Sequence, residues 1–524
     1  MPKRSDDFLS DLHHPTRRTF IRQALCAAVG TAALTNTIRD LRFINAAMAQ
    51  SSGISDYKAL VCIFLNGGND ANNLFIPTIP AEYNNYAAIR TAALALPNVD
   101  GSGAAALALN SLSSDGHTYG IHPACPELAA LFNAGKMAPV FNVGTLVYPV
   151  TKAQYQAGSV PLPPQLFSHA DQQVQWQTSV PDQPPVSGWG GRCADLLDQY
   201  NPHNGNTAVL SMCVTLAGAN TFEVGGTVQQ YSVSSGGVVS LTTNLGPSTA
   251  QAARATTLNS ILGIDDVQQN MLVSNYSQAL EHALASGTGL TTALNASPMS
   301  SYWNATTTFP TTVTVPNGGG TFTSSLMSQL KMVAKIIEAG YRASTTSSGL
   351  GMKRQIFFVQ VGGYDLHTGQ TSNAGQTTTN YSKVIVGAQA NLFAELSQSV
   401  NAFQSAMTQI GAQYGDASFD QRVTSFTVSD FGRTFPSNSL GSDHGWGSHH
   451  MVIGGAVKGQ RTYGTWPTLT VGGPDDTSTG RWIPTTAVDQ YAATMARWFG
   501  VDSTHMPTVF PNLGRFSTPY LGFL

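Results

Sequence analysis

Apolar runs of strand length alternate with amphipathic stretches along much of this 524-residue chain. The apolar runs predict strands buried on both faces, as in a parallel sheet, and they lie at Ala59–Leu65, Ala138–Val143, 355–361 and 422–432. Apolar residues spaced three and four apart predict helices, near Pro126–Ala134, 325–343 and about 384–413. This alternation of strand and helix predicts a parallel sheet covered by helices.

The middle of the chain has a different pattern. Residues 205–325 contain Thr-, Ser- and Gly-rich pieces with strand-like alternation, such as "TTVTVPNGGGTFT", and one helical patch near Asp265–Ala285. We interpret this region as a β-rich insertion in the main sheet or a cap on it.

The N-terminus has the pattern of an export signal. Arg17 and Arg18 precede a short apolar run over 24–35, and Ala47 and Ala49 fit a small-x-small cleavage site. The pattern predicts twin-arginine export to the periplasm or the medium, with the translocase as a transient partner; an amphipathic N-terminal helix is the alternative. The run is shorter than the ~20 residues that span a bilayer, so no permanent membrane span is predicted.

Charge is scarce, because Asp, Glu, Lys and Arg make up 10% of the chain, against roughly 25% in an average domain. Loss of residues 1–49 would remove seven Lys or Arg and four Asp or Glu, which changes the net charge from −3 to −6 for the mature domain, residues 50–524. This balance argues against a nucleic-acid partner.

Four cysteines remain in that domain, and none forms a C-x-x-C pair. They permit three full disulfide pairings or none, and the missing C-x-x-C argues against iron–sulfur clusters. They are Cys62, Cys125, Cys193 and Cys213.

Residue types that bind metals follow three of the predicted strands. In open α/β sheets, ligands bind beyond the carboxyl ends of the strands. The residues are Asn66 and Asp70 after the first strand, Asp365 and His367 after 355–361, and Asp430 and Arg433 after the apolar stretch "VTSFTVS" of the last.

Two Asp and His pairs have the spacing needed to hold an ion together. Asp365 and His367 are two apart, so in extended backbone their side chains point the same way, and the adjacent Asp443 and His444 can converge in a turn. Carboxylates and imidazoles without thiolates indicate a divalent metal ion, Zn²⁺ first, with Mn²⁺, Mg²⁺ or Ca²⁺ as alternatives. Each such aspartate also has a structural alternative as a turn or helix cap.

The neighbouring histidines, His449 and His450, are expected at the surface.

Several sequence blocks carry a family resemblance. They are "LVCIFLNGGNDANNLFIP", "YGIHPACPELAALFNAGKMAPVFNVG", "FSHADQQVQWQT", "VQVGGYDLHTGQ", "VSDFGRTFPSN", "GSDHGWGSHHMVIGGAVKGQRTYGTWP" and "DQYAATMARWFGV". In this order they resemble the exported proteins known as DUF1501, a domain of unknown function grouped with the alkaline phosphatase and sulfatase superfamily. The resemblance implies a three-layer α/β/α sandwich with a mostly parallel central sheet. It also implies a metal centre at the carboxyl edge of that sheet, which hydrolyses phosphate or sulfate esters.

The resemblance also implies roles for individual residues. Asp70 resembles the metal ligand after the first strand, Asp365 and His367 the ligands of one metal, and Asp443 with His444 the adjacent pair of another. The chain departs from the superfamily in two places. Its first aspartate does not end the strand directly, and Asp365 and His367 are closer together than usual.

Ser168, in "PPQLFSHADQQVQW", is the candidate nucleophile because it opens a predicted helix after a Pro-Pro break. Backbone N–H groups and the helix dipole favour an anion at that point. With Asp171, Ser168 also forms an S-x-x-D capping pattern, which needs no catalysis. Arg433 is expected either to hold an oxygen of a tetrahedral anion or to pair with a nearby carboxylate.

Two functions compete on this sequence. The first is an exported metal-dependent hydrolase of small-molecule or polymer-linked phosphate or sulfate esters, and the second is a noncatalytic exported binding protein that keeps the fold and a structural metal. The chain contains no C-x-P-x-R, so a formylglycine mechanism is not supported. It also contains no G-x-G-x-x-G and no G-x-S-x-G, which disfavours a redox enzyme and a serine esterase.

Overall fold

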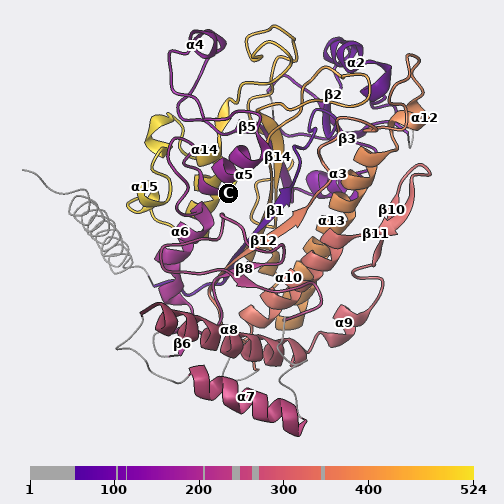
Figure 1. Cartoon of the computed structure of the whole chain (residues 1–524). Helices are drawn as coiled ribbons and strands as arrows, with labels where there is room; N and C mark the ends of the chain where they lie inside the picture. Colours follow the sequence, from indigo (N-terminus) through magenta and orange to yellow (C-terminus); the bar gives the residue numbers. More distant parts are fainter. Residues whose placement is uncertain are drawn as a thin grey trace, which may run out of the picture. The chain divides into compact units, whose positions relative to one another are not determined.

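The middle strand of the central sheet is buried along almost its whole length. This strand, β1 (Lys58–Leu65), runs parallel to β12 (Arg354–Val361) on one side and to β13 (Val423–Ser429) on the other. Its apolar sequence suits this position because helices cover both faces of the sheet (Figure 1). The structure is a computed structural model, and it describes residues 53–101, 104–113, 115–204, 207–238, 248–262, 271–343 and 348–524.

Nine strands form the central sheet in the part of the chain that the structure describes, and most of them are parallel. Only β14 (Ser448–Ile453) pairs antiparallel with its neighbours, which are β13 and β5 (Met137–Gly144). The strand order is β15 (Tyr463–Gly464), β5, β14, β13, β1, β12, β8 (Cys213–Thr215) and β9 (Tyr231–Ser232), and β16 (Thr486–Ala487) pairs with β5. The predicted mostly parallel sheet is therefore confirmed.

Helices pack against the sheet from two sides, as Figure 1 shows. On one side α10 (Ser325–Tyr341) and α3 (Pro126–Asn133) pack against α13 (Ala388–Tyr414). On the other side lie α5 (His169–Thr178), α6 (Trp189–Leu197) and α14 (Val488–Phe499), which contact β13, β12 and β1 respectively.

Within the described ranges, further helices and three small sheets lie outside the central sheet. The helices are α2 (Pro80–Leu94), α4 (Lys152–Ala157), α12 (Tyr381–Val384) and α15 (Met506–Val509). The small sheets join β2 (Phe75–Pro77), β4 (Tyr119–Ile121) and β3 (Leu107–Leu109); β6 (His203–Asn204) and β7 (Thr207–Ala208); and β10 (Thr312–Val315) and β11 (Gly320–Thr323).

The long helices largely follow the predicted apolar spacing. In α10 the predicted face is buried from Leu326 to Ile337, and the Ser324 hydroxyl caps its start by accepting a 2.9 Å hydrogen bond from the Met327 N–H. The helix predicted over about 384–413 is interrupted instead. Gly387 takes φ 124°, where a Cβ would collide with the backbone of Thr371, so α13 begins only after it.

The middle region differs from the predicted β-rich insertion. Its longest described elements are the helices α7 (Thr249–Leu262) and α8 (Met271–Asn295), followed by α9 (Ser300–Asn304). The predicted helical patch overlaps α8, although 263–270 lie outside the described residues. Two of the short strands, β8 and β9, join the central sheet, so their alternating sequence belongs to the main domain.

The predicted signal peptide lies outside the described residues. Within those residues, no helix has both the length and the apolar character needed to cross a membrane. The four cysteines of the predicted mature domain are buried and unpaired, so none of the three possible pairings is present.

His449 and His450 are buried, so the prediction that they lie on the surface is wrong. Both belong to β14, which lies between two strands in a sheet that is covered on both faces. The His449 ring stacks on Trp466 with centroids 4.8 Å apart, and the His450 ring packs edge-on against Trp176 at 4.7 Å. Burial lowers the pKa of both imidazoles to about 3, so both are neutral at pH 7.

Asp489, in the first turn of α14, makes stability depend on pH. Its side chain is buried and Oδ1 has no hydrogen-bond partner among the described residues, and burial raises the pKa to about 7. Between about pH 4 and 7 the unfolded chain has lost this proton while the folded chain keeps it, so the free energy of unfolding falls as pH rises.

We expect Asp489→Asn to remove this penalty because asparagine stays neutral. The variant should unfold at a higher denaturant concentration than the wild type at pH 8, and the difference should shrink towards pH 4. Urea unfolding of both proteins across this range measures the difference, in which all other titrating groups cancel. A difference that does not change with pH would contradict the assignment.

Candidate metal centre

The ends of β1, β12 and β13 bring three polar residues to one edge of the sheet. Leu65 lies opposite Val361 and Ser429, the last residues of the two neighbouring strands. Asn66 and Asp430 follow their strands directly, and Asp365 follows β12 after a short loop. Gly67 takes φ 120° beside that loop, and a Cβ there would collide with the backbone nitrogen of Asp365. Glycine therefore lets the loops after β1 and β12 approach closely.

His169 reaches this edge from the first residue of α5. Its Nδ1 lies 2.6 Å from Asp430 Oδ2, and its Nε2 lies 3.5 Å from Asp365 Oδ2. Gln173, one turn later, donates hydrogen bonds to Asp430 Oδ2 at 2.8 Å and to Asn66 Oδ1 at 3.0 Å. Sequence reasoning missed His169. The available signal was that His169 and Gln173, four apart, share one face of the helix that Ser168 opens.

His444 approaches Asp365 from a further loop, between β13 and β14, and His367 lies two residues after Asp365 in the loop that follows β12. The Nε2 atoms of these residues lie 3.4 and 3.2 Å from Asp365 Oδ1, and 3.0 Å from each other. His444 Nδ1 lies 2.8 Å from the Phe167 carbonyl oxygen, and His367 Nδ1 lies 2.9 Å from Asp443 Oδ1. The resemblance implied Asp365 and His367 as ligands of one metal and Asp443 with His444 as the pair of another. The structure brings the two pairs into contact, through His367 with Asp443 and His444 with Asp365.

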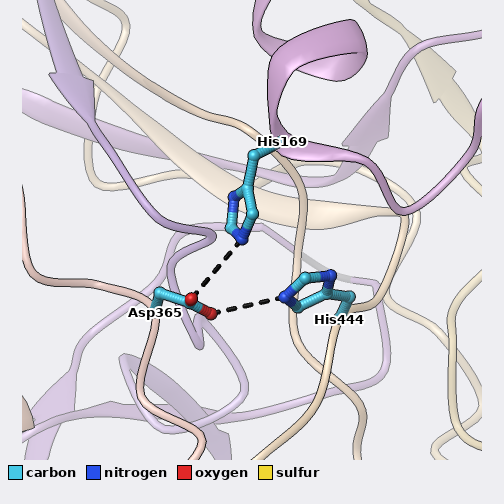
Figure 2. A group of neighbouring side chains, drawn as sticks. All are labelled: His169, Asp365 and His444. Carbon is cyan, nitrogen blue, oxygen red and sulfur yellow. Dashed lines mark ion pairs between the residues drawn. The ribbon is translucent and has the colours of Figure 1, made fainter.

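All three imidazoles are held in the same way. Each Nδ1 faces an oxygen that can only accept a hydrogen bond, so we assign the hydrogen of the neutral ring to Nδ1 and a lone pair to Nε2. The lone pairs of His169, His367 and His444 then lie around the carboxylate of Asp365. Figure 2 shows two of these rings with Nε2 turned towards the carboxylate. Negative and lone-pair atoms at such distances repel each other unless a cation joins them.

The residues fit a divalent metal ion. Ligand atoms of His169, Asp365 and His444 lie within 4.8 Å of one another. Four separations among the Asp365 carboxylate and the imidazole Nε2 atoms run from 3.0 to 3.5 Å. An ion with tetrahedral ligands at ~2.0–2.1 Å places them ~3.3 Å apart. His169 Nε2 is also buried with no hydrogen-bond partner among the described residues. Imidazole nitrogen with carboxylate oxygen suits Zn²⁺ first, and Mn²⁺ next.

Charge around the imidazoles also favours a cation. Three carboxylates contact the rings, those of Asp365, Asp430 and Asp443, and one guanidinium, that of Arg433, contacts Asp365. With neutral imidazoles this group carries two net negative charges, which one divalent ion balances. Burial lowers the pKa of His444, which favours the neutral ring that a metal requires.

Arg433 forms the ion pair that was one of its two predicted roles. Its Nη1 donates to Asp365 Oδ1 at 2.7 Å and to the Gly67 carbonyl at 3.3 Å, and Nη2 donates to the Ser442 carbonyl. The residue is only 1% exposed. Burial raises the pKa of Asp365, but the bond to Arg433 and its charge outweigh burial, so the pKa falls below the usual value.

Two predicted metal ligands, Asp430 and Asp443, contact imidazole Nδ1 atoms instead of the Nε2 atoms that face Asp365. Asp430 is fully buried, and its Oδ1 accepts a 3.1 Å hydrogen bond from the Gly67 N–H while Oδ2 faces His169. Asp443 accepts hydrogen bonds from Asn438 and His367 at 2.9 Å, and these bonds lower its pKa against the opposing effect of burial. Both carboxylates therefore orient a histidine, an arrangement that tunes many metal sites.

Asp70 lies in a separate buried network. It forms an ion pair with Arg90 and accepts a 2.5 Å hydrogen bond from Gln370. Gln370 accepts a 2.8 Å bond from the Ser442 hydroxyl, which links this network to the loop that Arg433 holds. The structure does not bring Asp70 together with the three imidazoles.

Ser168 occupies the N-cap position of α5, directly before His169. Its hydroxyl donates a 2.5 Å hydrogen bond to Asp171 Oδ2 and accepts none from the backbone of the first turn. The S-x-x-D pair therefore forms, but without the backbone hydrogen bond of a side-chain cap.

Comparison with known proteins identifies a family. A family model described as "Protein of unknown function (DUF1501)" matches residues 57–510, which include every residue of the metal centre. None of the curated proteins compared with the chain matches it.

We expect His169→Ala and His444→Ala to reduce bound metal. Each variant removes one Nε2 from the cluster, and loss of a ligand should weaken metal affinity more than tenfold. Elemental analysis of the purified, folded proteins measures the metal content. His505→Ala is the matched control, because His505 also pairs with an aspartate, Asp502, at 2.8 Å but lies outside the cluster. Equal metal content in all four proteins would show that the imidazoles bind no ion.

Proposed function

We propose that this chain, which belongs to the DUF1501 family, is a metal-dependent hydrolase of phosphate or sulfate esters. The observation that carries the proposal is the set of three imidazoles whose Nδ1 atoms are held by oxygens and whose Nε2 atoms surround Asp365. His169, Asp365 and His444 would hold the ion, with His367 completing the set. A bound divalent ion supplies Lewis-acid polarisation of a phosphoryl or sulfuryl oxygen.

The fold-level part of the proposal is an alkaline phosphatase-like architecture. Its support is the mostly parallel sheet and the position of the cluster beyond the carboxyl ends of β12 and β13. In open α/β sheets this edge is where ligands bind. The resemblance of the sequence blocks to the alkaline phosphatase and sulfatase superfamily is what favours phosphate or sulfate esters over other substrates.

Ser168 is the proposed nucleophile, and Asp171 is the proposed acceptor of its proton. The 2.5 Å hydrogen bond from the Ser168 hydroxyl to Asp171 has the geometry that activates a hydroxyl. Ser168 Oγ would attack phosphorus or sulfur, and its proton would pass to Asp171 and then to the departing alcohol. Water would next release the phosphate or sulfate from Ser168. His169 follows directly in the chain, so the proposed nucleophile is the sequence neighbour of a proposed metal ligand.

We also propose that residues 1–49 direct this domain through the twin-arginine translocase to the periplasm or the medium. The support is the sequence alone, with Arg17 and Arg18 before a short apolar run.

A noncatalytic exported binding protein with a structural metal is the second candidate. It is favoured by the same hydrogen bond of Ser168, because a hydroxyl committed to a carboxylate of its own helix also serves to order the start of α5. Both terminal nitrogens of Arg433 likewise donate to protein oxygens. Turnover separates the two candidates.

We expect the Zn²⁺-loaded protein to hydrolyse p-nitrophenyl phosphate or p-nitrophenyl sulfate. A chelator should abolish this turnover, and added Zn²⁺ or Mn²⁺ should restore it, because the ion polarises the ester. A melting curve recorded with the chelator checks that the domain stays folded. A folded, metal-loaded protein that turns over neither ester would contradict the hydrolase and leave the binding protein.

We expect Ser168→Ala to lower turnover by a factor on the order of 10³ or more with its metal retained, because alanine has no nucleophile. Ser168→Thr keeps a hydroxyl and should retain part of the activity. Thr151→Ala is the control for a purely structural loss, because Thr151 caps α4 through a 3.3 Å bond from the Gln154 N–H. If Ser168→Ala instead behaves like Thr151→Ala, with a loss of ~1 kcal/mol of stability and full turnover, Ser168 is a structural residue.

A further inference from the structure

A second guanidinium, that of Arg481, contacts the backbone of the metal-ligand residue His444. Arg481 donates a 2.8 Å hydrogen bond from Nε to the His444 carbonyl oxygen. Its guanidinium carbon also lies 4.3 Å from the centroid of the Phe167 ring. The backbone of a metal ligand and an aromatic face therefore fix both the position and the plane of this cation.

The loop that carries Arg481 is held by one buried carboxylate. Asp476 Oδ1 accepts hydrogen bonds from the backbone N–H groups of Ser478, Gly480 and Arg481 at 3.0, 2.8 and 3.0 Å. Asp476 is fully buried. Arg481 thus projects from a fixed turn, which reduces the entropy lost when its side chain binds a ligand.

Phe167 has a strained backbone, and it serves both Arg481 and the metal centre. Its φ of 72° is uncommon for a bulky residue. In this conformation its carbonyl oxygen accepts the His444 Nδ1–H bond at 2.8 Å, while its ring lies under Arg481. Strain of this kind is retained where the surrounding structure requires it, and it gathers at functional sites.

The two arginines near the cluster differ in whether their terminal N–H donors remain free. Arg433 is 1% exposed, and both of its terminal nitrogens donate to protein oxygens. Arg481 is half-buried, and within the described ranges neither of its terminal nitrogens has a hydrogen-bond or ion-pair partner. Arg481 therefore presents two pairs of N–H donors beside the site, in the fork that matches a tetrahedral oxyanion.

We propose that Arg481, supported by Phe167, forms the subsite that binds the charged oxygens of a phosphate or sulfate group next to the metal ligands. This subsite rests on the proposed hydrolase function and names the residue that recognises its substrate. A bound divalent ion would only balance the net charge of the three carboxylates and Arg433, so an unpaired cation at this position supplies further attraction for a dianionic ester that Arg433 cannot. The preferred ligand is a compact tetrahedral dianion, which takes two N–H donors of one guanidinium.

The test measures binding of inorganic phosphate and sulfate to the metal-loaded protein by calorimetry, so it does not depend on turnover. Arg481→Gln should weaken phosphate binding about tenfold to a hundredfold, the range expected for a lost bidentate charge-assisted contact. Arg481→Lys should lie between this variant and the wild type because it keeps the charge but loses the fork. Arg497→Gln is the matched control. It removes the same charge from an arginine stacked at 4.8 Å on Tyr520, and it should bind phosphate as the wild type does.

Elemental analysis of the same samples separates the two levels of the proposal. Metal in the wild type and in Arg481→Gln, with phosphate binding lost only in Arg481 variants, supports the subsite. Metal in both proteins with equal phosphate affinity overturns the subsite and leaves the metal centre intact. A metal-loaded wild type that binds neither phosphate nor sulfate also overturns it, and a wild type without metal refutes the metal centre itself.

Discussion

One ion pair, between Arg433 and Asp365, fastens the loops that build the candidate site. The two residues are 68 positions apart, and the same guanidinium also donates to the carbonyl oxygens of Gly67 and Ser442. Arg433 therefore joins the loops after β1, β12 and β13 at the edge where these three strands end. Because each loop carries or supports a metal-ligand residue, the positions of the imidazoles depend on this contact. The pair also keeps Asp365 ionised, so a carboxylate rather than a carboxylic acid faces the imidazoles.

Much of the fold follows from local sequence patterns, and the departures have physical causes. The apolar run in β1 and the spaced apolar residues of α10 predicted their elements, because the faces that a strand or helix buries determine the spacing of its apolar residues. The break before α13 depends on the close approach of Gly387 to Thr371, and the spacing of apolar residues does not indicate such a contact. The error at His449 and His450 has the same origin. Two polar residues in a strand of six look exposed until the aromatic side chains that cover them are known.

The site was predictable where it depends on strand ends and not where it depends on packing between distant elements. Asp365, His367 and His444 were predicted because they follow predicted strands or form an Asp-His pair. His169 was missed because α5 reaches the sheet edge only through its packing against β13. Asp70 had the right residue type after the right strand, but a buried arginine, Arg90, engages it instead. The atom that each carboxylate contacts shows its role. Asp365 faces imidazole Nε2 atoms, as a ligand would, whereas Asp430 and Asp443 contact Nδ1 atoms and orient the rings.

We propose that His169, His444 and Asp365, with His367 beside them, hold a divalent ion at the carboxyl edge of the sheet. The most direct test is a crystal structure of the Zn²⁺-loaded protein with diffraction data collected on both sides of the zinc absorption edge. We expect an anomalous peak bounded by His169 Nε2, His444 Nε2 and the carboxylate of Asp365. A well-ordered site without an anomalous peak, or a peak only at Asp70, would show that these imidazoles and Asp365 do not hold the ion.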